Sequence, residues 1–349
     1  MGLNIYEILL NSINSGLEMV LVTKYNLSNN KIEKKIYRFD ELDGEILEYA
    51  NTARQKGTAN NIKINEDENI LVEIFKRESR LIVFGAGHVG KHLCNFASKT
   101  GFNVTVVDDR AYFANKENFN EDVDVICNSF ENAFDILNIN EEDYVVLVTR
   151  GHKYDKFCLE KILNLKDLKY IGMIGSRRRV KAMKEELISE GYSKEKLDSI
   201  YSPIGLNIGA VTPEEIAISI LAELISVKRI GKLAVKNEPI KIGNSSELNK
   251  EVVEKLSTIK DEKISIVTVI STKGSTPRKA GSKMVVYDTA NVIGTIGGGC
   301  AEANIIVKAA NIAGSDNFKI ETIDMTGQIA EDEGMVCGGI MTVLIEGIM

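Results

Sequence analysis

Residues 80–110 read RLIVFGAGHVGKHLCNFASKTGFNVTVVDDR. An apolar strand enters a G-x-G-x-x-G loop, a helical stretch follows, and a second apolar strand ends in Asp108. The glycines Gly85, Gly87 and Gly90 permit a tight turn and a close approach to a pyrophosphate at a helix N-terminus. Asp108 lies about where a ribose-binding acid is expected. This stretch predicts a β-α-β unit with a nucleotide-phosphate site.

The alternation of strands and helices continues after this unit. Apolar strands are expected at DVDVIC, YVVLVTR and KYIGMIG, and the last helix has Thr212 as N-cap with Glu215 completing a capping box. We predict a Rossmann-like domain with a parallel sheet at 79–232. A polar, proline-containing linker follows at 233–245.

The two ends of the chain resemble each other in the order of their elements. Both read helix, strand, helix, strand, which predicts an internal duplication around the central domain. The segment 1–78 is a degenerate copy because it lacks cysteine and glycine-rich motifs, whereas 246–349 is the complete copy. The fold class is therefore α/β, with a Rossmann-like domain flanked by two copies of a smaller α/β domain. We expect the copies to pack together or across a homodimer, because each has few elements and an edge to cover.

Composition excludes several classes of function. The 349 residues carry a formal net charge of −7, which gives no electrostatic reason to expect a nucleic-acid partner. No uncharged apolar run approaches the ~18 residues of a membrane span, and the first residues lack a basic signal region. We expect a cytoplasmic protein without a membrane partner. The five cysteines contain no C-x-x-C pair, so neither a disulfide framework nor a local zinc site is indicated.

The stretch GTIGGGCAEANII, residues 294–306, delivers Cys300 to an expected helix start. Its sulfur would lie near unpaired backbone N–H groups and the positive end of the helix dipole, which lowers a thiol pKa. The preceding glycines could close around an anion while the thiolate reaches a metal or a sulfur atom. The alternative is a small apolar side chain packed at a tight turn. The three glycines that precede Cys300 are Gly297, Gly298 and Gly299.

Two further motifs in the C-terminal copy are candidates for the same site. GSTPRKAGSKM supplies Ser275, Thr276 and Arg278 as an oxyanion clamp, unless it is an ordinary loop. Cys337 lies beside a glycine pair before an expected strand, and structural and functional roles are equally open for it. We interpret the remaining cysteines as packing residues: Cys94, Cys127 and Cys158.

The central domain has candidates beside its glycine loop. The motif TRGHKYD ends a strand at the edge where open α/β sheets bind ligands, and it contains a histidine and an aspartate that could do acid–base work. The basic turn SRRR could hold a second phosphate. A surface turn and a solvated helix start are the alternatives. The candidates are His88, Arg150, His152, Asp155, Arg177 and Arg178.

Taken together, these motifs resemble the XdhC/CoxI family of xanthine dehydrogenase and carbon monoxide dehydrogenase maturation factors. The resemblance rests on VISTKGSTPRKAGSKM, GTIGGGCAEA, VCGG, VFGAGHVGKHL, VTVVDDR, TRGHKYD, YIGMIGSRRR and SPIGLNIGAVTPEEIAISILAELI. It covers roughly residues 80–230 and 262–346. The family usually places the cysteine-bearing domain before the Rossmann domain, whereas here it follows.

The resemblance implies a chaperone of the molybdenum cofactor (molybdopterin). Such proteins bind the cofactor transiently, support its sulfuration by a cysteine desulfurase and deliver it to a molybdenum hydroxylase such as xanthine dehydrogenase. Cys300 matches the family cysteine associated with cofactor binding and would contact the metal. On this interpretation the protein is a non-catalytic accessory factor. The alternatives are an NAD(P)-dependent oxidoreductase, which leaves Cys300 unexplained, and a nucleotide-sensing regulator that uses the GAGHVG loop.

Overall fold

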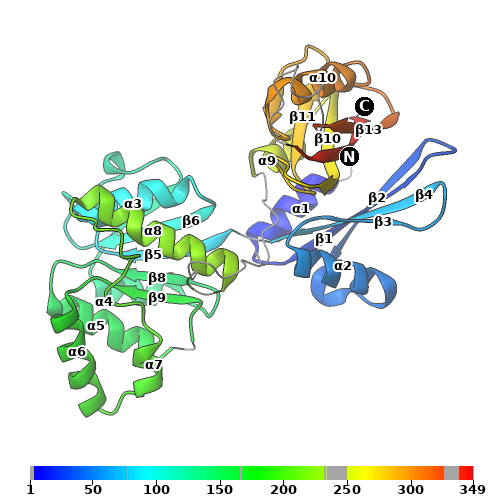
Figure 1. Cartoon of the computed structure of the whole chain (residues 1–349). Helices are drawn as coiled ribbons and strands as arrows, with labels where there is room; N and C mark the ends of the chain where they lie inside the picture. The colour runs from blue at the N-terminus through cyan, green and yellow to red at the C-terminus, as the bar shows by residue number, and fades with distance from the viewer. Residues whose placement is uncertain are drawn as a thin grey trace. The chain divides into compact units, whose positions relative to one another are not determined.

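The computed structural model describes residues 4–76, 78–165, 167–231, 233, 250–325 and 338–348, without the side chains of residues 300 and 301. These residues form two compact units (Figure 1). The described parts of 1–77 and 242–349 form one unit, called here the terminal unit. Those of 78–241 form the central unit.

The central unit is built on a five-stranded parallel sheet in the order β7-β6-β5-β8-β9. The predicted Rossmann-like domain is therefore confirmed. Its strands are β5 (Ser79–Phe84), β6 (Phe102–Asp108), β7 (Val123–Cys127), β8 (Tyr144–Leu147) and β9 (Tyr170–Met173). Its helices are α3 (His88–Ser98), η2 (Lys116–Asn118), α4 (Phe130–Leu137), α5 (His152–Leu163), α6 (Arg177–Ser189), α7 (Lys194–Asp198) and α8 (Pro213–Ile230).

Helices cover both faces of this sheet, so four successive residues of the central strand β5, Leu81 to Phe84, are all buried. Leu81 and Val83 of β5 pack under α3 and α8, whereas Ile82 and Phe84 pack under α4, α5 and α6 (Figure 1). A strand buried on both faces reads as a continuous apolar run, which is why LIVF carried no alternation.

The last helix of the central unit has the caps expected from the sequence. The backbone N–H of Glu215 donates to Thr212 Oγ1, and the Glu215 carboxylate accepts from the backbone N–H of Thr212. Gly231 ends the helix in the left-handed conformation with φ +72°. The capping box is thus confirmed in both directions.

The terminal unit contains two antiparallel sheets whose strand orders correspond. The N-terminal copy has the order β2-β1-β4-β3, and the C-terminal copy has β11-β10-β14-β13 with β12 added at one edge. The N-terminal elements are α1 (Ile5–Asn14), β1 (Met19–Asn26), β2 (Lys31–Arg38), η1 (Phe39–Glu41), α2 (Gly44–Lys56), β3 (Asn60–Lys63) and β4 (Glu68–Phe75). The C-terminal elements are α9 (Lys250–Thr258), β10 (Ile264–Lys273), β11 (Lys283–Tyr287), β12 (Val292–Gly294), α10 (Gly299–Ala310), β13 (Phe318–Asp324) and β14 (Ile340–Ile348).

The two copies pack against each other through a shared apolar core. Side chains of α1, α9, β1 and β10 form one cluster that includes Leu9, Leu21, Leu256 and Ile266. The Asn4 side chain, at the N-cap of α1, donates to the carbonyl of Leu256 at 2.6 Å. The first helix of each copy therefore lies against its counterpart.

Among the residues described, two ion pairs with little exposure to solvent cross between the copies, and we call them the reciprocal ion pairs. Lys34 of β2 binds Glu346 of β14, with Nζ 2.6 Å from Oε1. Lys283 of β11 binds Glu73 of β4, with Nζ 2.9 Å from Oε1. In each pair one copy provides the lysine and the other provides the glutamate.

The strand register makes the reciprocal ion pairs equivalent positions of the duplication. Lys34 lies opposite Thr23 in its sheet, and Lys283 lies opposite Thr268. Leu21 lies two residues before Thr23 on β1, opposite Glu73. Ile266 lies two residues before Thr268 on β10, opposite Glu346. The correspondence therefore extends from strand order to individual residues.

No helix in the described part of the chain is long and apolar enough to cross a membrane.

Replacing Lys34 by Met should destabilise the terminal unit, because it leaves the Glu346 carboxylate buried without its cation. We expect the free energy of unfolding to fall by about 3–5 kcal/mol. Denaturant unfolding of the full chain measures this loss. Lys31→Met, which removes an exposed ammonium from the same strand, is the matched control.

Replacing Lys34 by Met and Glu346 by Leu together should recover much of that stability, because no buried charge is then left alone. Equal effects of Lys34→Met and Lys31→Met would contradict the role assigned to the pair.

Candidate functional site

Two of the three glycines in the GAGHVG loop are required by the fold. Gly85 has φ +117°, and a Cβ there would lie 2.3 Å from the carbonyl oxygen of Val148. A Cβ on Gly90 would lie 1.9 Å from the carbonyl oxygen of Gly85. Both positions therefore exclude any side chain.

The middle glycine of the loop is not required by the fold. Gly87 has φ −65°, and no heavy atom lies within 4 Å of the place its Cβ would take. It is the N-cap of α3, and no side chain caps the helix there. Open space beside an uncapped helix N-terminus is what close approach of a pyrophosphate needs. Packing therefore does not explain this glycine, and the phosphate site at Gly87 stays a prediction.

Asp108, the expected ribose-binding acid, lies beside the glycine loop, and both oxygens of its carboxylate already accept hydrogen bonds within the protein. Its Oδ2 accepts from the backbone N–H of Ala86 at 2.9 Å, and Arg110 donates to both oxygens at 2.8 Å through Nε and Nη2. Burial alone would raise the pKa of Asp108, yet these hydrogen bonds lower it below its ordinary value. Its side chain is only 1% exposed.

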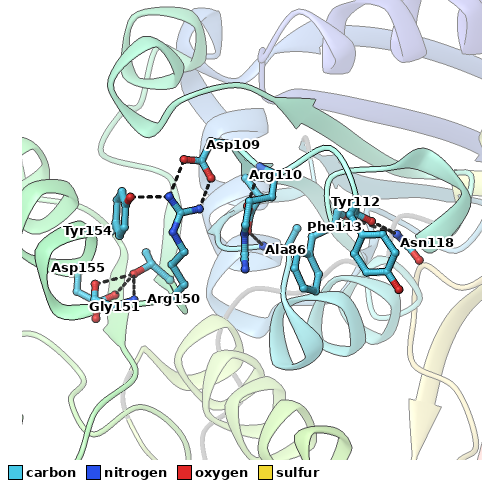
Figure 2. Close-up of polar contacts among 12 residues, drawn as sticks. Ala86, Asp109, Arg110, Tyr112, Phe113, Asn118, Arg150, Gly151, Tyr154 and Asp155 are labelled. Atoms are coloured by element: carbon cyan, nitrogen blue, oxygen red, sulfur yellow. Dashed lines mark hydrogen bonds and ion pairs between the residues drawn. The ribbon is translucent and has the colours of Figure 1, made fainter.

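A second arginine spans the carboxyl edge of the sheet (Figure 2). Arg150, which follows β8, binds Asp109, which follows β6, through two N–H···O contacts, and it also donates to the hydroxyl of Tyr154. Asp109 raises the pKa of the Arg150 guanidinium further. Because β5 lies between β6 and β8, this ion pair passes the end of the strand that carries the glycine loop.

The histidine and aspartate of TRGHKYD do not pair with each other, and the structure describes both. Asp155 is buried, accepts from Thr149 Oγ1 at 2.6 Å and pairs with Arg179 at 2.9 Å. His152 Nε2 lies 3.7 Å from a carboxylate oxygen of Glu186 instead. The acid–base pair left open by the sequence is therefore not formed.

The remaining central candidates lie at helix starts. Arg177 and Arg178 are exposed at the beginning of α6, and the neighbouring Arg179 makes the ion pair that joins this turn to α5. His88 is the first residue of α3. Its ring packs edge-on against the ring of Phe113, with 6.1 Å between the two ring centres. Sequence reasoning missed Arg179, because three consecutive arginines gave no reason to single it out.

In the C-terminal copy, the segments that carry the three motifs come together. A Cβ on Gly297 would lie 2.3 Å from the ring of Pro277, and one on Gly339 would lie 2.3 Å from the carbonyl oxygen of Ser275. The GSTPR loop therefore contacts both the GTIGGGC loop and the segment that begins β14. Ser275 thus lies beside Gly339, although more than sixty positions separate the two residues in the sequence.

The glycine loop before α10 has a backbone that only glycine adopts readily. Gly297, Gly298 and Gly299 have φ of +141°, +74° and +77°. Gly298 and Gly299 are exposed, with no heavy atom within 4 Å of the places their Cβ atoms would take. Cys300 is the second residue of α10, and its side chain is not among those described. Cys337 lies outside the described residues altogether.

A hydrogen bond within the GSTPR loop fixes the shape of the proposed oxyanion clamp. Thr276 Oγ1 donates to the carbonyl of Arg278 at 2.9 Å, which fixes the turn. Ser275 is exposed and Arg278 is half-buried. The Thr276 hydroxyl hydrogen is thus committed to the backbone of its own loop.

Glu302 is a site residue that sequence reasoning missed. Its Oε2 accepts from the backbone N–H groups of Ile296, Gly297 and Gly298 at 2.9–3.1 Å and from Thr295 Oγ1 at 2.6 Å. Burial acts to raise its pKa, but the Thr295 hydroxyl and the three N–H groups lower it below the ordinary value. The expected phosphate cradle at Gly297 and Gly298 therefore already holds the protein's own carboxylate.

The packing role inferred for three cysteines is confirmed for two of them. Cys94 and Cys158 are buried, and burial raises the pKa of each thiol. The inference was wrong for Cys127, which is exposed at the end of the edge strand β7. Among the residues described, no cluster of His, Cys, Asp and Glu could hold a metal ion.

Alanine substitutions should separate the two kinds of glycine in the GAGHVG loop. Gly90→Ala should lower the free energy of unfolding by about 1–3 kcal/mol or more, because its Cβ meets the Gly85 carbonyl. Gly87→Ala should leave stability nearly unchanged. Thermal unfolding of both variants measures the difference, and a similar loss for Gly87→Ala would show that packing requires this glycine too.

Comparison with known proteins finds family models that match the central unit and part of the C-terminal copy. Residues 81–224 match the model of the XdhC Rossmann domain, and residues 260–324 match that of the XdhC and CoxI family. The uncharacterized protein YqeB of Escherichia coli K12 is 32% identical over 161 residues, 46% of this chain and 29% of that protein. A Bacillus subtilis 168 protein, named as a probable component of xanthine dehydrogenase, is 32% identical over 165 residues, 47% and 48% of the two chains.

The chain therefore spans less than half the length of these two relatives. Among solved structures, one described as a xanthine dehydrogenase from Bacillus halodurans is 28% identical, with a TM-score of 0.49 over 63% of this chain and 64% of that one. The two matching models describe one family, and together they cover more than half of the residues of this chain. The protein therefore belongs to the XdhC/CoxI family.

Proposed function

We propose that this protein binds the molybdenum cofactor transiently and supports its sulfuration and insertion into a xanthine dehydrogenase-type hydroxylase. The observation that carries the proposal is the meeting of the GSTPR loop, the GTIGGGC loop and the start of β14. Membership of the XdhC/CoxI family and the name of the Bacillus subtilis relative support the link to xanthine dehydrogenase.

The residues of this surface fit an anionic cofactor with a soft metal. The open backbone at Gly298 and Gly299 leaves room for a group to approach the start of α10. Ser275 and Arg278 offer a hydroxyl and a guanidinium on the neighbouring loop, as phosphate binding requires. Cys300, one residue into the helix, would bring its thiolate to the molybdenum or its sulfido ligand. Bound in this way, the cofactor would be cargo to be handed on.

Glu302 has a positioning role in this proposal. Its carboxylate holds the three N–H groups before Gly299, so the loop keeps its open form without a ligand. A preformed loop avoids the entropy cost of ordering glycines on binding. The phosphate is then left to the N-terminal end of α10 and to the GSTPR loop.

Two protein partners follow from this role. A cysteine desulfurase would supply the sulfur, and a molybdenum hydroxylase would receive the finished cofactor. The protein itself would be an accessory factor without a turnover reaction. The competing oxidoreductase function needs an acid–base group beside a nicotinamide, and the candidate for it, His152, faces Glu186.

Cys300→Ala should weaken retention of the cofactor while leaving the fold intact. Removing an outer contact of a metal site costs about 10–100-fold in affinity, so loss of a direct contact should cost at least about tenfold. Molybdenum and pterin content after purification from a host that makes the cofactor measure the effect. Cys127→Ala, which removes an exposed thiol of the central unit, is the matched control.

Alkylation rates test the same thiol independently. Cys300 should react faster than Cys127 at neutral pH, because the helix N-terminus favours the thiolate. Wild-type cofactor content in Cys300→Ala, together with a Cys300 rate no greater than that of Cys127, would assign the thiol to packing.

A further inference from the structure

We propose that the crevice at the carboxyl edge of the central sheet binds a dinucleotide whose adenosine ribose carries a 2′-phosphate, so that NADP(H) is preferred to NAD(H). The proposal rests on Arg110, which lies over Phe113 and shares the Asp108 carboxylate with the backbone N–H of Ala86, one residue before Gly87. It concerns the central unit alone and does not depend on the molybdenum proposal.

The crevice has the form of a dinucleotide site. The chain leaves β5 toward β6 on one side, while β8 flanks β5 on the other, so the strand order reverses between β5 and β8. Ligands of open α/β sheets bind outside the carboxyl ends of the strands at such a point. Gly87 lies at this edge with open space beside it. A pyrophosphate can therefore reach the start of α3.

Neither carboxylate at the end of β6 is available for ribose hydroxyls. Asp108 is buried and engaged through both oxygens by Arg110 and the Ala86 N–H. Asp109 is engaged through both oxygens by Arg150. An NAD site needs an acid here that accepts from the ribose 2′-hydroxyl. Binding a free ribose would require one of these charge-assisted pairs to break.

Arg110 is placed to receive a phosphate instead. Its contacts to Asp108 use Nε and Nη2, so Asp108 does not occupy the Nη1 edge of the guanidinium. The Arg110 side chain is 33% exposed. The Arg110 guanidinium carbon lies 4.1 Å from the centre of the Phe113 ring, and this contact restricts the orientation of the guanidinium group. Figure 2 shows Arg110 between Arg150 and Phe113.

Charge at this edge is balanced before a ligand arrives. Arg110 and Arg150 neutralise Asp108 and Asp109, so an incoming phosphate does not meet a net negative surface. A planar guanidinium with a free edge matches two phosphate oxygens. The combination favours a phosphorylated ribose over a free one.

Titration of the full chain with NADPH and NADH, followed by nucleotide fluorescence, tests the proposal. One added charge-assisted contact corresponds to an affinity about 10- to 100-fold higher for NADPH. The pair 2′,5′-ADP and 5′-AMP should show the same preference by calorimetry, because they differ only in the 2′-phosphate. Equal affinities within each pair, or no binding of either dinucleotide, would overturn the proposal without any variant.

Arg110→Leu should reverse the preference. The leucine keeps apolar contact with Phe113 but releases Asp108, so NADPH should weaken to the level of NADH or below, while NADH binding holds or strengthens. Lys169→Leu removes a positive charge just before β9, at the opposite edge of the same sheet, and should change neither affinity. Parallel losses for both dinucleotides in Arg110→Leu would assign Arg110 to the fold rather than to the ribose phosphate.

Discussion

The terminal unit depends on four charges with little exposure to solvent, each of which has its partner in the other copy. Lys34 and Glu73 of the N-terminal copy find their partners in Glu346 and Lys283 of the other. A buried charge left alone is strongly destabilising, so these pairs permit one mutual placement of the two sheets and penalise others. That placement in turn fixes β10 and β14, which bring the GSTPR loop and the residues Gly338 and Gly339 to the same end of the sheet. The candidate cofactor surface is thus held by residues that do not touch it.

The two glycine loops share a structural feature, although they lie in different units. In each loop the protein supplies its own carboxylate to backbone N–H groups: Asp108 to Ala86, and Glu302 to residues 296–298. Glycine-rich loops expose several donors at once, and an unpaired buried donor is costly. An internal acid resolves that cost in the absence of ligand. Because these N–H groups are occupied, Gly87 in one loop and Gly299 in the other are the glycines that have open space beside them and no bond to the internal acid.

Local patterns predicted the central fold because the information for it is local. An apolar run, a glycine loop and a helix within thirty residues identified β5, α3 and β6, and the capping box located the start of α8. The engagement of Asp108 by Arg110 was not predictable, since it depends on how the chain turns after β6. Glu302 escaped notice because an acid in the first turn of a helix is common. The reciprocal ion pairs join residues 312 and 210 positions apart, a separation at which no sequence period operates.

The reciprocal ion pairs also have the pattern of an isologous contact, in which two equal partners each give the same residue and receive the same residue. Such a contact between separate molecules weakens on dilution. With both halves on one polypeptide it is intramolecular, and its strength is set by effective concentration rather than by the amount of protein present. The N-terminal copy can therefore lack every glycine motif and still hold the C-terminal copy in place, provided that β2 supplies Lys34 and β4 supplies Glu73. Its contribution to the candidate cofactor surface is to be a permanently tethered counterpart of the C-terminal copy.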